Sequence, residues 1–158
     1  MSSAAVVAAL IERGLTIAVA ESLTGGMLVS ELIATPGASR AVVGGVVAYD
    51  TRLKHTLLGV DADLLADAGA VDPRVAEQMA DRVRACLAVD GHPADIGIST
   101  TGVAGPDEQD GKAVGTVFVG LAWGSRVFSV ELHLAGTRGA IRSAAVAEAL
   151  LQLEMLLE

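Results

Sequence analysis

Residues 17–26 read IAVAESLTGG: a short apolar strand runs into Glu21-Ser22, and Thr24-Gly25-Gly26 then opens a helix. Strand-to-helix turns are places where α/β proteins display a reactive side chain or bind an anion. Their glycines let the backbone approach a ligand closely, and the first N–H groups of the helix are unpaired. Ser22 is therefore a candidate nucleophile, a candidate anion ligand or an N-cap.

Outward from this turn, expected helices and strands alternate along the chain. Strands are predicted at 16–20, 41–49, 95–99, 114–122 and 126–134, and helices over 2–13, 24–34, 50–59, 61–68, 72–88 and 138–156. Gly124-Ser125 between the last two strands is a hairpin signal. This order predicts a single domain over 1–158 with an α/β fold. We expect a three-layer α/β/α sandwich with a mixed, mostly parallel sheet and one C-terminal hairpin.

Composition narrows the classes of partner. The formal net charge is −8, so we expect no nucleic-acid partner, because nonspecific binding depends on many Lys and Arg contacts to phosphates. No apolar run approaches the roughly 20 residues that span a bilayer, so no membrane partner is expected. The apolar stretch at 4–11 follows no basic residue and ends at Glu12-Arg13. It favours a first helix over a signal peptide, and a cytoplasmic location.

The helix expected over 72–88 holds the single cysteine, Cys86. Asp72 as N-cap and Pro73 at the first position begin this helix, and Val75 starts a buried stripe that recurs every fourth residue. One cysteine excludes an internal disulfide, and we expect a buried, inert thiol. The apolar, alanine-rich surface is compatible with a homodimer.

Lys54 changes the interpretation of Ser22. The chain uses nine arginines and only two lysines, and a buried lysine, unlike an arginine, can lose its proton and act as a base. Tyr49, the only tyrosine, would relay a proton or hold the hydroxyl if its phenol lay between the two. The alternative is a solvated lysine beside a half-buried tyrosine. Ser22, Tyr49 and Thr101 each lie at or just past an expected strand end, where one cleft would hold them.

A glycine-rich segment, TTGVAGP at 100–106, follows a buried strand. Thr101, Gly102 and Gly105 are candidates for a backbone loop that offers N–H groups to a ligand; the alternative is an ordinary turn. The stretch from Gly105 to Lys112 is not a phosphate-binding P-loop, because five residues separate its glycines where four are required.

Arg138 and Arg142 lie one turn apart at the start of the last expected helix. Two guanidinium groups beside free N–H groups suit a phosphate or a carboxylate. The alternative is pairing with acidic neighbours, of which the chain has many.

Metal and dinucleotide motifs are missing from the sequence. The three histidines are scattered, and no carboxylate cluster has ligand spacing, so we expect no metal and no cofactor. The sequence holds neither G-x-G-x-x-G nor G-x-S-x-G, which disfavours dinucleotide oxidoreductases and ordinary α/β-hydrolases.

Taken together, seven segments resemble the CinA C-terminal domain family over about residues 5–157. They are AESLTGG at 20–26, Gly45 to Tyr49, Lys54 with LLGV at 57–60, GAV at 69–71, TGVAGP at 101–106, VGTV at 114–117, and Arg138 with Arg142. The resemblance implies a metal-independent amidohydrolase that deamidates nicotinamide mononucleotide (NMN) to nicotinic acid mononucleotide and ammonia, in pyridine-nucleotide salvage.

By this resemblance Ser22 is the nucleophile, and Tyr49 and Lys54 complete a Ser–Tyr–Lys catalytic set. Attack on the carboxamide releases ammonia and leaves an acyl-enzyme that water hydrolyses. Both steps need an oxyanion hole, for which backbone N–H groups near Thr24-Gly25 or Thr101-Gly102 are candidates. The other substrate-binding candidates are Gly26, Gly105 and, for the 5′-phosphate, Arg138 and Arg142.

The chain departs from the family pattern beside the nucleophile, where Leu23 replaces the usual Cys, and in a short 107–112 loop. Neither departure removes a proposed catalytic residue, but both affect the pocket. Two other functions therefore stay open. One is a nucleotide-binding or regulatory module without turnover, and the other is a hydrolase of a different amide or ester.

Overall fold

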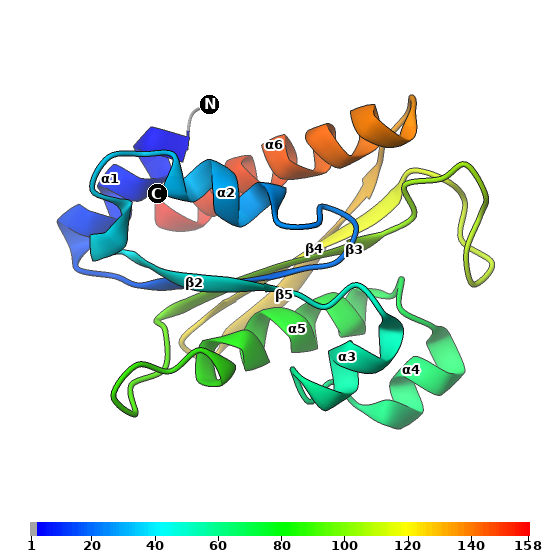
Figure 1. Ribbon diagram of the computed structural model, residues 1–158, viewed down its shortest axis with the longest axis horizontal. Helices are drawn as coiled ribbons and strands as arrows, with labels where there is room; N and C mark the ends of the chain where they lie inside the picture. The colour runs from blue at the N-terminus through cyan, green and yellow to red at the C-terminus, as the bar shows by residue number, and fades with distance from the viewer. Residues whose placement is uncertain (1–2) are drawn as a thin grey trace.

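Helices lie on both faces of one sheet in the computed structural model, which describes residues 3–158 (Figure 1). One face is covered by α1 (Ser3–Arg13), α2 (Met27–Ile33) and α6 (Arg138–Leu157), and the other by α3 (Thr51–Thr56), α4 (Ala62–Ala68) and α5 (Pro73–Cys86). The predicted three-layer α/β/α architecture is confirmed.

The sheet is mixed, as predicted. Within residues 3–158 its five strands run in the order β2-β1-β3-β4-β5. Their bounds are Ile17–Glu21 for β1, Val42–Val47 for β2, Ile96–Gly102 for β3, Thr116–Trp123 for β4 and Arg126–His133 for β5. β1 is parallel to β2 and β3, whereas β4 is antiparallel to β3 and β5. Only β4 therefore runs against the other strands, and β4 with β5 forms the expected hairpin.

Several boundaries differ from the prediction. The helix expected from 24 begins at Met27, with Gly26 as its N-cap, because residues 22–25 form a turn. β3 continues to Gly102 and pairs there with Val117, so part of the expected glycine-rich loop is strand. A short 3-10 helix, η1 (Ala38–Arg40), precedes β2 and was not predicted.

Helix α5 rests directly on β3 and β4. Asp72 accepts a hydrogen bond from the Arg74 N–H and Pro73 follows it, so the predicted N-terminus is confirmed. Glycines in both strands make the close approach possible. A Cβ at Gly97 would collide with the Ala80 carbonyl oxygen, and one at Gly120 with the Ala76 carbonyl oxygen.

The end of α5 corrects one expectation. Cys86 is exposed, not buried, because it is the last residue of α5 and lies about one turn beyond the buried stripe of Val75, Met79 and Val83. The Cys86 thiol donates a weak hydrogen bond to the Leu57 carbonyl oxygen, 3.5 Å away.

Within residues 3–158, no helix combines the length and apolar character that crossing a membrane requires.

Candidate active site

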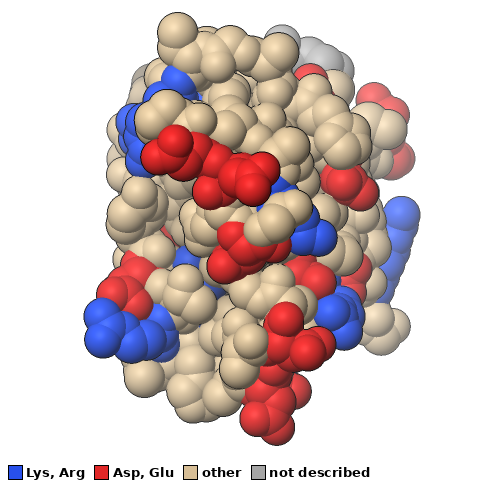
Figure 2. Space-filling view, turned by 90° about the vertical axis from the view of Figure 1, so that its right-hand side faces the viewer, with Lys and Arg blue, Asp and Glu red and all other residues tan. Residues whose placement is uncertain are grey.

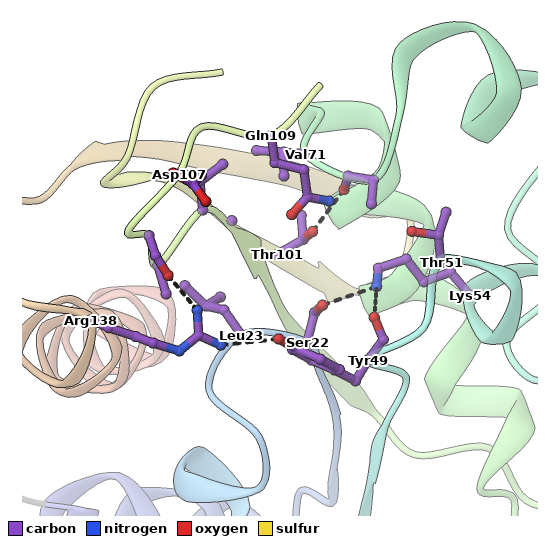
Figure 3. Close-up of a pocket in the computed structure, with 15 residues that line it drawn as sticks. Ser22, Leu23, Tyr49, Thr51, Lys54, Val71, Thr101, Asp107, Gln109 and Arg138 are labelled. Atoms are coloured by element: carbon purple, nitrogen blue, oxygen red, sulfur yellow. Dashed lines mark hydrogen bonds between the residues drawn. The ribbon is translucent and has the colours of Figure 1, made fainter. Parts of the chain in front are cut away.

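A cavity of about 200 Å³ opens where the carboxyl ends of β1 and β3 meet the segment after β2 (Figure 3). This is the edge at which parallel strands of an α/β sheet usually bind ligands. The cavity is lined by polar side chains from four separate parts of the chain, namely Ser22, Tyr49, Thr51, Lys54, Thr101, Asp107, Gln109 and Arg138. The predicted shared cleft for Ser22, Tyr49 and Thr101 is therefore present.

Ser22 and Lys54 contact each other directly at the bottom of this cavity. Ser22 follows β1, and its backbone N–H donates to the Thr100 carbonyl oxygen at 3.0 Å. Lys54 projects from the first turns of α3, and its Nζ donates to Ser22 Oγ at 2.9 Å and to the Ala48 carbonyl oxygen at 2.7 Å. The solvated-lysine alternative is wrong, because the Lys54 side chain is fully buried.

Burial changes the acid–base behaviour of Lys54. Removal from water lowers its pKa from 10.5 to about 8, although the nearby Asp50 carboxylate acts in the opposite direction. Asp50 caps α3, and hydrogen bonds from Arg52 hold the Asp50 pKa well below its usual range. Near neutral pH a measurable fraction of Lys54 is therefore uncharged and able to accept a proton.

Tyr49 is placed differently from the sequence expectation. Its side chain is 60% exposed, and its phenol oxygen accepts a hydrogen bond from Arg138 Nη2 at 3.0 Å. Lys54 Nζ contacts the Tyr49 carbonyl oxygen, at 3.5 Å, rather than the phenol. A phenol that links lysine to serine is thus not what the geometry shows. Lysine and serine meet without an intermediary, and Tyr49 forms part of the cavity rim (Figure 3).

Glu21 accounts for the turn that carries Ser22. Its side chain is fully buried and accepts backbone hydrogen bonds from Gly26, Leu28 and Val29 at 3.1, 3.0 and 2.9 Å. The N-terminus of α2 is therefore occupied by a carboxylate of the protein itself. The expectation that its N–H groups face a ligand, and the reading of Ser22 as its N-cap, are both wrong.

Arg142 and Thr24 hold the same turn from its other side. Arg142 donates to the carbonyl oxygens of Leu23 at 2.8 Å and Thr24 at 3.3 Å, and Thr24 Oγ1 lies 2.7 Å from Thr100 Oγ1. The predicted substrate-binding residues Thr24, Gly25, Gly26 and Arg142 do not line the cavity. Their contacts fix the turn instead, because the Arg142 guanidinium is bonded to carbonyl oxygens of the turn itself.

The other predicted binding residues do reach the cavity. Thr101, Gly102, Gly105 and Arg138 line it, although Thr101 Oγ1 donates to the Ala70 carbonyl oxygen at 2.7 Å. Arg138 Nη1 donates to the Gly105 carbonyl oxygen at 2.6 Å. Arg138 therefore joins α6, the Gly105 loop and Tyr49 across the rim.

Sequence reasoning missed four polar residues of the site. Thr51, Asp107 and Gln109 line the cavity, and Glu21 supports its turn. The only available signal was their position within or beside recognised segments, since isolated polar residues have no periodicity. Among residues 3–158, no group of three or more His, Cys, Asp or Glu side chains is placed to bind a metal.

Comparison with known proteins agrees with the fold and the motifs. A CinA-like protein of Frankia casuarinae is 48% identical over 141 residues, covering 89% of this chain and 31% of that protein. A CinA-like protein of Synechococcus elongatus is 46% identical over 156 residues, covering 96% and 36%. The chain thus spans about a third of the length of these relatives.

Solved structures match over nearly the whole chain. A competence-damaged protein (CinA) superfamily protein from Enterobacter cloacae superposes with a TM-score of 0.92 at 29% identity, covering 100% of this chain and 94% of that one. One from Escherichia coli gives 0.89 at 32% identity, covering 98% and 87%. The match to the CinA C-terminal domain extends over residues 1–157, and the chain belongs to this family.

Proposed function

We propose that this protein is a serine amidohydrolase that converts NMN to nicotinic acid mononucleotide and ammonia. One observation carries the proposal: the 2.9 Å contact between Ser22 Oγ and the fully buried Lys54 Nζ, inside a cavity. A serine needs an adjacent base to become a nucleophile, and a lysine of lowered pKa meets that need. Family membership supports the substrate, through the resemblance that implies NMN deamidation.

The first half-reaction follows from this contact. Neutral Lys54 Nζ accepts the Ser22 proton while Oγ forms a bond to the carboxamide carbon of NMN. The tetrahedral intermediate then collapses: its C–N bond breaks, and the Lys54 ammonium returns the proton to the departing nitrogen. Ammonia leaves, and an ester joins the nicotinoyl carbon to Ser22.

Water completes the cycle with the same two residues. Neutral Lys54 removes a proton from the attacking water, the ester C–O bond breaks, and Ser22 Oγ recovers its proton. Nicotinic acid mononucleotide is released. No cofactor is required, because proton transfer and nucleophilic attack are both supplied by protein side chains.

Oxyanion stabilisation is assigned to the turn after Ser22. Among residues 3–158, the N–H group of Leu23, a residue that lines the cavity, donates to no protein acceptor, whereas the Gly25 N–H donates to the Ser22 carbonyl oxygen at 3.1 Å. Glu21 and Arg142 fix this turn, so its donors need little reorganisation when negative charge develops on the substrate oxygen. Arg138, which lines the rim, is the candidate ligand for the 5′-phosphate.

The deciding experiment measures ammonia and nicotinic acid mononucleotide released from NMN in chelator-treated buffer. Wild type should turn NMN over, and Ser22→Ala should not. If wild type binds NMN without turnover, the protein is a nucleotide-binding module. If it hydrolyses an unrelated amide or ester but not NMN, it is a different hydrolase, which the buried Leu23 beside Ser22 would favour.

A further inference from the structure

One charged group in the cavity has no role in the chemistry above. The charged side chains that line the cavity are Lys54, Asp107 and Arg138. Lys54 is bonded to Ser22 and Ala48, and Arg138 to Gly105 and Tyr49. Among residues 3–158, no group forms a hydrogen bond or an ion pair with the Asp107 carboxylate. The cavity therefore presents one unpaired negative charge to a ligand.

Asp107 is held at this place by the segment before it. Gly105 adopts a φ of 87°, which turns the chain after Ala104, and its carbonyl oxygen is bonded to Arg138. In Figure 3, Asp107 lies on the loop side of the cavity, across from the Ser22–Lys54 pair. A ligand whose carboxamide meets Ser22 would extend from that pair toward Asp107.

Further acidic residues follow Asp107 in the sequence. Its exposed loop also contains Glu108 and Asp110. Figure 2, which faces the right-hand side of Figure 1, shows several acidic side chains across this face of the molecule, with Lys and Arg side chains among them. Of these carboxylates, Asp107 lines the cavity and is therefore the one placed to attract a cationic group of a bound ligand.

We propose that Asp107 is a specificity-determining residue that favours carboxamides on a positively charged pyridinium ring over the same carboxamides on a neutral ring. This inference rests on the proposed amidase function. Attachment of ribose to the ring nitrogen of nicotinamide makes the ring a quaternary cation, and the Asp107 carboxylate is the unpaired cavity group of opposite sign. A neutral dihydropyridine ring of nearly the same size would lose this attraction.

The test compares NMN with its reduced form, NMNH, which keeps the carboxamide, ribose and phosphate but has a neutral ring. Binding of both to Ser22→Ala is measured by isothermal titration calorimetry, so that turnover does not interfere. The same titrations are repeated on Ser22→Ala combined with Asp107→Asn. The matched control is Ser22→Ala with Glu108→Gln, which removes a neighbouring charge from a residue that does not line the cavity.

The expected result is a preference for NMN over NMNH that falls by roughly two- to fivefold on Asp107→Asn, the size typical of a partly exposed charge pair. Weaker NMN binding should account for most of the change. Glu108→Gln should leave the preference nearly unaltered, and added salt should reduce it. An unchanged NMN to NMNH ratio in Asp107→Asn overturns the inference, as does the absence of any preference in Ser22→Ala.

Failure of the proposed function is recognised separately. If wild type does not hydrolyse NMN but the Asp107-dependent preference is present, the charge selection stands and the amidase proposal fails. If wild type hydrolyses NMN and the ratio is insensitive to Asp107, the amidase proposal stands and the inference about Asp107 fails.

Discussion

Lys54 Nζ lies 2.9 Å from Ser22 Oγ, and the lysine side chain is fully buried. The two residues are 32 positions apart in the sequence. They meet because β1 and β2 are parallel neighbours, which places the segments after both strands at one edge of the sheet. In its uncharged form the Lys54 amine can therefore accept the proton of the Ser22 hydroxyl.

Lys54→Arg should lower kcat by about 10²–10⁴-fold, the usual contribution of a general base, because a guanidinium keeps its proton. Steady-state NMN hydrolysis measures the loss, and circular dichroism establishes that the variant is folded. The matched control is Lys112→Arg, which changes the other lysine. Lys112 does not line the cavity. Near-wild-type turnover by Lys54→Arg would remove lysine from the role of base.

The pH dependence of kcat/KM should follow deprotonation of Lys54. The active form has a neutral amine, so kcat/KM should rise about tenfold per pH step below a pKa of about 8 and level off above it. The measurement is initial NMN hydrolysis between pH 6 and roughly 9.5. A profile that is flat, or that falls as pH rises toward 8, is incompatible with this assignment.

Stability should depend on pH through the same residue. Between pH 8 and 10.5 the folded protein has released the Lys54 proton while the unfolded chain retains it, so the free energy of unfolding rises with pH. The full gain relative to Lys54→Met is about 3 kcal/mol. Denaturant unfolding of both proteins at pH 7 and 10 tests this, because other titrating groups cancel in the difference. If the free energy of unfolding changed with pH by the same amount in both proteins, Lys54 would not be a buried lysine that releases its proton on folding.

Tyr49→Phe should have a small effect. The phenol is bonded to Arg138 rather than to Lys54, so its removal loses one rim hydrogen bond, worth about 1 kcal/mol. We expect a change of roughly fivefold or less, mainly in KM for NMN. A loss of kcat as large as that of Lys54→Arg would instead show that the phenol enters the proton path during turnover.

Glu21→Gln tests whether the turn must be held rigidly for catalysis. A glutamine keeps the size of the side chain, but its NH₂ group cannot accept hydrogen bonds from the backbone N–H groups that donate to the carboxylate. We expect kcat to fall by at least tenfold while KM for NMN changes little, because Glu21 does not line the cavity. Thermal unfolding is measured in parallel, and Glu31→Gln in α2 is the control. Unaltered kcat in a folded variant would limit Glu21 to a structural role.

Local patterns predicted most of the fold. The buried stripe of α5 begins at Val75, and its Asp72-Pro73 start gave the correct N-terminus. Gly124 marked the β4–β5 turn correctly. The turn at Ser22 was less predictable, because Glu21 reaches forward to N–H groups as far as Val29, and no sequence spacing reveals where a buried carboxylate points.

The site was predictable only in part for the same reason. Ser22 and Lys54 were found from residue chemistry and family resemblance, but the direction of the Tyr49 phenol depends on Arg138, 89 positions away. Arg142 was expected at a phosphate and instead contacts the Leu23 carbonyl oxygen. Long-range partners of flexible charged side chains are decided by packing, which a single sequence does not display.

Gly97 and Gly120 lie beneath α5, and the residues just before that helix, Ala70 and Val71, form one wall of the cavity. A side chain at either glycine would push the helix outward, and the wall would move with it, away from Thr101, which is bonded to the Ala70 carbonyl oxygen. The width of the cavity thus depends on how closely α5 approaches the sheet. Two residues without side chains, remote from any reacting atom, limit what Ser22 can reach.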